Sequence, residues 1–194
     1  MKNEAIVTQT DRLILQKFDE SMAEAVHLLS IDDANRRFQS DEVFETVEDA
    51  EETIDFLMSQ YGGTDGPLVY PILLRDDTNI GYVQAVPIEG GDWEIGYHIG
   101  KAYTCNGYAT EAVKAFLPVI MSDLGIRKIN GICVKENIAS CKVLEKAGFT
   151  LVYEGIGCYQ GEEREIHKYS FEKAADRREE MITLKRKGKI RHYL

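Results

Sequence analysis

The sequence predicts a single mixed α/β domain of the α+β type. The chain has 194 residues, 44% of them hydrophobic, which is enough for one substantial core and too little for two. Three consecutive segments with strand character lie within residues 67–100 and predict a meander of neighbouring strands. Amphipathic helical patterns precede and follow the meander. No repeat, low-complexity segment or linker divides this pattern.

The elements before the meander are one strand and two helices. The stretch TDRLILQKF, residues 10–18, alternates loosely between apolar and polar side chains, as a partly buried strand does. Residues 21–30 and 47–61 each repeat apolar side chains at helical spacing, and Gly62-Gly63 ends the second helix.

The meander itself should run through residues 67–75, 78–88 and 92–100, with turn-forming residues at 76–79. A helix is expected from about Gly107 to about Leu124, with Gly125 as its C-cap. The remaining predicted elements are a strand at 127–134, a helix from about Asn137 to Ala147, and a final pair of strands around 149–156 and 163–171.

Composition excludes several classes of protein. The formal net charge of -10 argues against general affinity for nucleic acid, which needs clustered Lys and Arg. The four cysteines form no C-x-x-C pair and have no suitably spaced histidine, so we expect reduced thiols and no metal site. The N-terminus lacks a basic start followed by an apolar stretch, and no apolar run approaches the roughly 20 residues of a membrane span. We therefore expect a cytoplasmic protein.

Charge is distributed unevenly along the chain. Acidic side chains crowd residues 31–56, whereas residues 173–194 are rich in Lys and Arg. Residue by residue, each region is typical of the solvated face of a helix. The alternative for the first region is an acidic rim that attracts a cationic substrate, because the fields of many charges add.

One loop has the character of an anion site. Residues 101–112, KAYTCNGYATEA, place the turn dipeptide Asn106-Gly107 directly before a helix. A helix N-terminus offers unpaired N–H groups, and Gly107 with the small Ala109 lets a bulky anion approach them. The loop lacks the Lys of a nucleoside-triphosphate loop and the three glycines of a dinucleotide fingerprint. These residues alone are equally consistent with an ordinary strand-to-helix turn.

Three motifs occur together in this chain: EIGYHI at 94–99, NGYATEA at 106–112 and ENxxSxxVLEKAGF at 136–149. In combination they resemble the GNAT superfamily of acetyl-CoA-dependent N-acetyltransferases. The opening TDRLIL is similar to the first strand of the branch that acetylates ribosomal-protein N-termini. The resemblance spans about Thr10 to Phe171 and implies a GNAT-like acyltransferase fold, with a mostly antiparallel, splayed central sheet flanked by helices. Residues 1–173 would form the N-acetyltransferase domain, and 174–194 a basic C-terminal extension that is helical in part.

The resemblance implies acetyl-CoA as cosubstrate and no metal. In the family, a Gln/Arg-x-x-Gly-x-Gly/Ala loop holds the pyrophosphate of coenzyme A through backbone amides. The family commonly has Gln or Arg where this chain has Thr104, and this branch has Gly where it has Cys105. Ile99 matches a strand position that pairs with the pantetheine arm, and Asn137 one that hydrogen-bonds the same arm. The cofactor-binding positions of the loop are Thr104, Cys105, Asn106, Gly107, Tyr108, Ala109 and Thr110.

Acyl transfer needs a base for the ammonium proton and an acid for the departing thiolate. Strand alternation places Glu94 and His98 on one face, where either of them, or water, could take the ammonium proton. A purely structural role accounts for each residue about as well as a catalytic one. Glu94 would then be a solvent-facing strand carboxylate, and His98 a partly buried ring whose hydrogen bonds are satisfied. The resemblance makes Ser140 the general acid. Many relatives use a Tyr at the position of Leu144 instead, and Tyr159 is the reserve candidate.

We therefore expect an N-acetyltransferase that moves acetyl from acetyl-CoA to a primary amine by direct attack. The acceptor stays open among a ribosomal-protein N-terminus, a polyamine, an aminoglycoside-like antibiotic and an amino acid, and a homodimer stays open too. Neither nucleic acid nor a membrane is an expected partner. Two rival functions are a catalytically idle acyl-CoA-binding module and a non-catalytic protein-interaction domain that uses the acidic face and basic tail.

Overall fold

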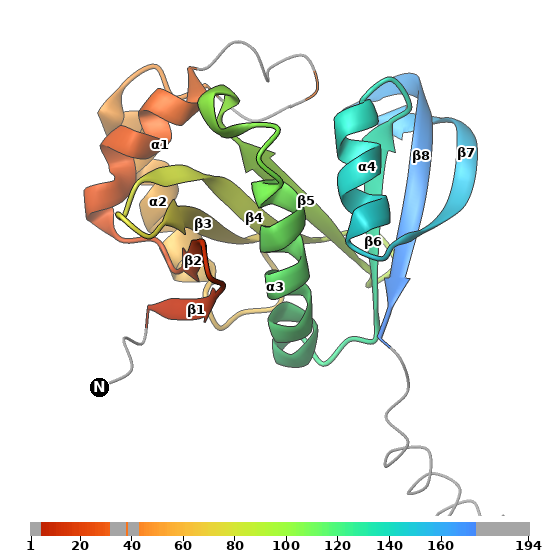
Figure 1. The fold of residues 1–194 in the computed structure, drawn as a ribbon, viewed down its shortest axis with the longest axis horizontal. Helices are drawn as coiled ribbons and strands as arrows, with labels where there is room; N and C mark the ends of the chain where they lie inside the picture. Colours follow the sequence, from red (N-terminus) through yellow and green to blue (C-terminus); the bar gives the residue numbers. More distant parts are fainter. Residues whose placement is uncertain (1–4, 32–37, 39–42, 174–194) are drawn as a thin grey trace, which may run out of the picture.

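The computed structural model describes residues 5–31, 38 and 43–173. Within these residues the chain forms four α-helices and eight strands (Figure 1). The predicted C-terminal extension, residues 174–194, lies outside the described residues, as does part of the acidic stretch at 31–56. No helix of the described part is both long enough and apolar enough to span a membrane.

All eight strands belong to one sheet, in the order β1-β2-β3-β4-β5-β6-β8-β7. Each neighbouring pair is antiparallel except β5 and β6, which are parallel. The predicted meander, the strand after it and the final pair are confirmed. The strands are β1 (Ile6–Gln9), β2 (Leu13–Gln16), β3 (Leu68–Leu74), β4 (Asn79–Pro87), β5 (Trp93–Ile99), β6 (Lys128–Val134), β7 (Thr150–Tyr159) and β8 (Glu162–Glu172).

The parallel pair is the irregular part of the sheet. β5 and β6 share a single register pair, Glu94 with Asn130, and Figure 1 shows the two strands running apart from there. The sheet therefore divides into one half with β1 to β5 and another with β6, β8 and β7. Beyond Glu94, β5 and β6 share no further register pair. The splayed sheet implied by the resemblance is present.

Helices cover both faces of the sheet. On one face, Phe116 of α3 (Tyr108–Asp123) and Leu144 of α4 (Ile138–Lys146) belong to the larger core cluster. On the other face, Ala50 and Ile54 of α2 (Val47–Gln60) pack with α1 (Ala23–Ser30) around Val69 of β3. Side chains that alternate along β5 therefore face different pairs of helices.

Local signals set the helix ends that matter for the site. Gly125 has φ 64 and ends α3, as predicted, because a glycine adopts this left-handed conformation without strain. The N–H of Ile126 donates to the carbonyl of Met121 at 3.0 Å, which satisfies one of the last carbonyls of the helix. The start of α3 at Tyr108 is also where the loop of residues 101–107 delivers the chain from β5.

Candidate active site

The N-terminus of α3 opens the candidate site. Gly107 is the N-cap and has φ 80, a left-handed conformation that suits glycine. No side chain caps this helix, so its first N–H groups, which have no partner within a helix, are suited to bind an anion. A Cβ placed on Gly107 would have only Arg12 Nη2 nearby, at 3.9 Å, so space in front of the backbone is open.

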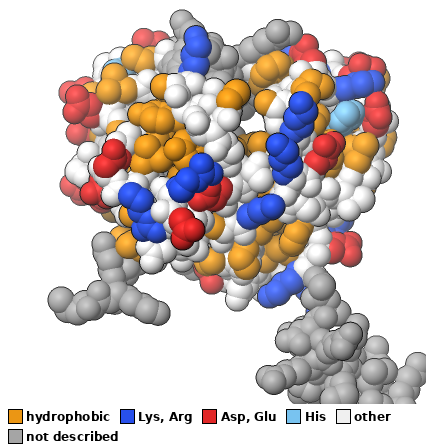
Figure 2. Space-filling model, viewed as in Figure 1, with side chains coloured by type: hydrophobic (Ala, Val, Ile, Leu, Met, Phe, Trp, Pro, Cys, Tyr) orange, Lys and Arg blue, Asp and Glu red, His pale blue; other side chains and the backbone are white. Residues whose placement is uncertain are grey.

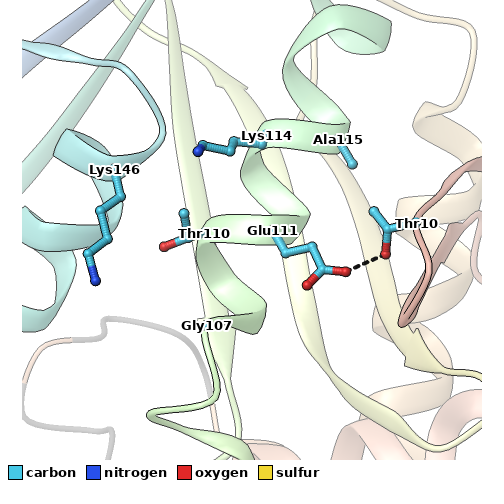
Figure 3. Close-up of a pocket in the computed structure, with 7 residues that line it drawn as sticks. All are labelled: Thr10, Gly107, Thr110, Glu111, Lys114, Ala115 and Lys146. Atoms are coloured by element: carbon cyan, nitrogen blue, oxygen red, sulfur yellow. Dashed lines mark hydrogen bonds between the residues drawn. The ribbon is translucent and has the colours of Figure 1, made fainter.

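A cavity of about 570 Å³ lies beside this helix start. In Figure 3, the side chain of Lys114 points from α3 towards α4, and Lys146 of α4 lies across from Thr110; all three residues line the cavity. Figure 2 shows Lys and Arg side chains gathered around the centre of this face, although the whole chain has a net charge of -10. Two ammonium groups next to an uncapped helix N-terminus favour a negatively charged ligand. The cavity is lined by Thr10, Gly107, Thr110, Glu111, Lys114, Ala115 and Lys146.

Two polar side chains of the loop hold its own backbone in shape. Asn106 donates from Nδ2 to the carbonyl oxygens of Tyr103 and Thr104, at 3.1 and 3.0 Å. The hydroxyl of Thr104 donates to the carbonyl of Lys101 at 2.9 Å. The contact of Asn106 and Thr104 with a cofactor stays a prediction, whereas their hydrogen bonds to the backbone of the loop are part of the fold.

Arg12, just before β2, braces the loop from outside, and sequence analysis missed it. Its guanidinium pairs with Glu111, donates to the carbonyl of Asn106 at 3.2 Å and lies 4.7 Å from the ring centroid of Tyr108. Thr10 adds a hydrogen bond of 2.5 Å to Glu111. Arg12 and Glu111 are 99 residues apart in the chain, so no local pattern could have joined them.

Cys105 carries backbone strain at the centre of this loop. It is exposed and has φ 64, a conformation that costs a residue with a Cβ about 1–2 kcal/mol. Replacing Cys105 with Gly should therefore raise the free energy of unfolding by about 0.5–1 kcal/mol, after the greater entropy of glycine in the unfolded chain is subtracted. Denaturant unfolding with a constant m-value measures this change.

The matched control is Cys158→Gly, which makes the same chemical change at an exposed position within β7. Cys158 is in extended strand, where glycine is destabilising by roughly 0.5–1 kcal/mol. The two variants should therefore shift the free energy of unfolding in opposite directions. A loss of stability in both would show that the conformation of Cys105 is not strained.

Glu94 lies at the point where the sheet splays. Its neighbours Trp93 and Ile95 point into the core shared with α3 and α4, so the carboxyl faces the α1–α2 side. Burial raises the pKa of Glu94 to about 7, although Lys168 opposes the shift. A carboxyl group that titrates near neutral pH is well matched to removing a proton from an ammonium group. The position and chemistry suit the predicted base.

His98 shares the face of Glu94 but lies four residues further along β5, about 14 Å away at strand spacing. Its side chain is 7% exposed, and its ring stacks on Tyr82 with centroids 5.6 Å apart. One amine cannot contact both residues. The splay point and the raised pKa favour Glu94 as the base, and the assignment of either residue stays a prediction.

The opposite side of the splay carries Ser140. Asn137 is the N-cap of α4, as predicted, and its side-chain oxygen accepts the N–H of Ser140 at 3.1 Å. The hydroxyl oxygens of Ser140 and Tyr97 are 2.9 Å apart, and the Tyr97 hydroxyl is 3.0 Å from the carbonyl oxygen of Ser140. Tyr97 thus connects β5, in one half of the sheet, with α4 over the other half. Tyr97 lies within the EIGYHI motif, but its contact with Ser140 could not be predicted from the sequence.

The other predicted residues have clear positions. Ile99 pairs with Gly81 of β4 and packs against the larger core cluster. Leu144 is 1% exposed and fills the core, so no polar group stands at that position of α4. The hydroxyl of Tyr159 donates to the carbonyl of Phe38 at 3.3 Å. Among the described residues, no three His, Cys, Asp or Glu side chains are grouped to hold a metal ion.

Comparison with known proteins gives consistent matches. A family described as "Acetyltransferase (GNAT) domain" matches residues 12–150. The uncharacterised N-acetyltransferase YnaD of Bacillus subtilis is 31% identical over 141 residues, which cover 72% of this chain and 79% of that protein. An acetyltransferase of the GNAT family from Bacillus anthracis is 26% identical, with a TM-score of 0.71 over 85% of this chain and 97% of that one.

A further solved structure shares the fold at lower identity. RimL, a ribosomal L7/L12 alpha-N-protein acetyltransferase in complex with coenzyme A as a disulfide with one of its cysteines, is 21% identical to this chain. Its TM-score is 0.75 over 88% of this chain and 99% of that one. The fold and family predicted from the three sequence motifs are confirmed by these matches.

Proposed function

Because this chain belongs to the GNAT family of acetyltransferases, we propose that it transfers the acetyl group of acetyl-CoA to a primary amine. The observation that carries the proposal is the uncapped N-terminus of α3 at Gly107, which follows β5 through the loop of residues 101–107 and lies beside the lysine-lined cavity. The helix N-terminus and the lysines suit an anionic cosubstrate, and the gap between β5 and β6 leaves room for it to meet an amine.

The residues around Gly107 fit coenzyme A. When bound, acetyl-CoA supplies an acetyl thioester at the end of a long arm that carries phosphate groups. The N–H groups at the start of α3 would receive the pyrophosphate, and Lys114 and Lys146 would offset phosphate charge. The amides of the arm would pair with β5 near Ile99, as the resemblance implies, in the way that a peptide adds to a sheet. RimL, which has this fold, was solved with coenzyme A.

Glu94 and Ser140 would divide the proton transfers between them. Glu94 takes a proton from the ammonium group, which leaves a neutral amine able to attack the thioester directly. Ser140 offers its hydroxyl to the departing sulfur. The two side chains lie on opposite faces of the splayed sheet. Glu94 would therefore act on the amine from one face, and Ser140 on the sulfur from the other.

The acceptor that we propose is a cationic amine, either a ribosomal-protein N-terminus or a small molecule. The first choice is supported by the fold shared with RimL, whose description names a ribosomal protein. Both choices are supported by α2, which carries five acidic residues and no basic one. None of these carboxylates forms an ion pair with another described residue.

A panel of primary amines, scored by release of free thiol from acetyl-CoA, tests this function. The panel includes N-terminal peptides of ribosomal proteins, polyamines, aminoglycosides and amino acids. We expect acetyl-dependent thiol release with at least one of them. Calorimetry with acetyl-CoA distinguishes the rivals: binding without release by any amine indicates an idle acyl-CoA-binding module, and no binding at all indicates a protein-interaction domain.

The acidic face of α2 should determine how the acceptor responds to salt. Glu48, Glu51 and Glu52 are exposed on this helix. If their field concentrates a cationic amine, the KM for the acceptor should rise with salt, because the Debye length falls to about 8–10 Å near physiological ionic strength. Changing all three to Gln should raise the acceptor KM several-fold at low salt and remove most of its salt dependence. The KM for acetyl-CoA should rise less or fall.

The control removes three negative charges elsewhere, through Asp65→Asn, Asp77→Asn and Glu89→Gln, all at exposed positions outside α2. It changes the net charge by the same amount, so it isolates the effect of position. Equal acceptor kinetics in the two triple variants would mean that only net charge matters. Acceptor choice would then depend on other residues.

A further inference from the structure

The structure brings together two hydroxyl groups that no sequence motif connects. We propose that Tyr97 is a positioning residue of the acyl-transfer site, which directs the hydroxyl proton of Ser140 towards the departing sulfur of coenzyme A. This inference rests on the proposed function and deepens it. It gives a role to a side chain of β5 that lies on the face opposite Glu94.

The distances leave Tyr97 two acceptors for one proton. Its hydroxyl is 3.0 Å from the Ser140 carbonyl oxygen and 2.9 Å from Ser140 Oγ. A phenol has a single O–H to donate, and a serine hydroxyl can both donate and accept. Only one of the two contacts can therefore use the proton of Tyr97 at any moment.

These options produce two arrangements of Ser140. If Tyr97 donates to the carbonyl, the Ser140 hydroxyl can donate to Tyr97 or to the sulfur of Cys133, and its proton then points away from the gap. If Tyr97 donates to Oγ, the proton of Ser140 is free to face a neighbouring acceptor. A negatively charged sulfur in the gap between β5 and β6 favours the second arrangement, because hydrogen bonds to charged groups are the stronger ones.

Tyr97 keeps its own proton in this scheme. Burial raises the pKa of its phenol above the ordinary value, and the hydrogen bond with Ser140 only partly opposes this. The other titratable groups that act on the phenol are Cys133 on β6, Cys141 on α4 and Tyr159 on β7. Tyr97 therefore acts as a permanent donor to Ser140, and the serine hydroxyl keeps its proton while donating it as a hydrogen bond to the departing thiolate.

The second arrangement should also be visible without turnover. A thiolate that accepts a hydrogen bond from Ser140, whose hydroxyl in turn accepts one from Tyr97, is stabilised relative to its thiol. The thiol pKa of bound coenzyme A should therefore be lower than in solution. The ultraviolet absorbance of the thiolate, followed from pH 6 to 10 with the full chain saturated by coenzyme A, reports this pKa. In Tyr97→Phe the pKa should rise by about half a unit to one unit, as expected for one lost hydrogen bond.

The kinetic test is a double-mutant cycle between Tyr97→Phe and Ser140→Ala. Tyr97→Phe should lower the single-turnover rate of acetyl transfer by about 3- to 10-fold and leave the Kd of acetyl-CoA within about twofold. Adding Tyr97→Phe to Ser140→Ala should change the rate no further, because Tyr97 acts through the serine hydroxyl. Rate losses that multiply, or an unchanged thiol pKa in Tyr97→Phe, would overturn the inference.

Tyr61→Phe is the matched control. Its hydroxyl also makes two hydrogen bonds, accepting the N–H of Phe18 at 3.0 Å and donating to the carbonyl of Val69 at 2.6 Å. This variant should lose stability while the thiol pKa and the transfer rate stay unchanged. Failure of the proposed function is seen in the wild type, as no thiol release with any amine. If coenzyme A also fails to bind the wild type, both proposals are wrong.

Discussion

Glu94→Gln is expected to lower the rate of acetyl transfer at pH 7 by about 10²- to 10⁴-fold, the range of a lost general base. The Gln side chain keeps the shape of Glu94 and loses its basicity, so the Kd of acetyl-CoA should not change. In the wild type, kcat/KM for the acceptor should fall about tenfold per pH unit below the pKa of about 7 that burial imposes on Glu94. This tenfold fall of kcat/KM per pH unit, which reports protonation of Glu94, should be absent from the pH profile of the variant.

The control for this experiment is Glu89→Gln, which removes an exposed carboxylate from the turn between β4 and β5. It should keep the wild-type rate and pH profile. Wild-type turnover in Glu94→Gln would assign the base to His98 or to bulk water. His98→Gln in the same assay separates these two.

The same substitution should reveal the cost of burying a carboxylate. The pKa of Glu94 rises from 4.5 to about 7 on folding, so the folded state favours the protonated form. The stability that this preference provides is complete below pH 4.5 and is lost as the pH rises through 7, a change of about 3 kcal/mol. Gln has no charge to bury, so the stability of Glu94→Gln relative to the wild type should increase over this interval. Urea unfolding at pH 4.5 and pH 8 measures the difference.

Gly107→Val should weaken the binding of acetyl-CoA by about 10- to 100-fold, equivalent to losing one or two hydrogen bonds to a charged group. Valine adopts φ 80 only with strain, and its branched side chain would occupy the open space in front of the first N–H groups of α3. Calorimetry at a temperature where the variant remains folded measures the Kd.

Gly125→Val, at the other end of α3, is the control for backbone strain. Gly125 has φ 64 and, like Gly107, has no close neighbour that a Cβ would meet. The substitution should destabilise the protein by a similar amount but leave the affinity for acetyl-CoA unchanged. If Gly107→Val binds acetyl-CoA as the wild type does, the assignment of this loop to the pyrophosphate is wrong.

Much of the architecture could be read from local patterns. Alternation along β3, β4 and β5 and the apolar spacing of α3 and α4 reflect burial on one side of an element, which depends on neighbours two to four residues away. The short strand β1 was missed because it has four residues with exposed ends, a pattern too brief to stand out. Gly107 was found for a similar local reason: a turn glycine directly before a helix predicts an open backbone.

The sequence by itself thus determined the family and most of the secondary structure, and it predicted an anion site at Gly107, because these features depend on residues close together in the chain. The tertiary structure alone decided which side chains act together. The Arg12–Glu111 pair, the two lysines of the cavity and the Tyr97–Ser140 contact each join elements far apart in sequence. The pKa of Glu94 likewise depends on burial by the folded sheet, which no short stretch of sequence encodes.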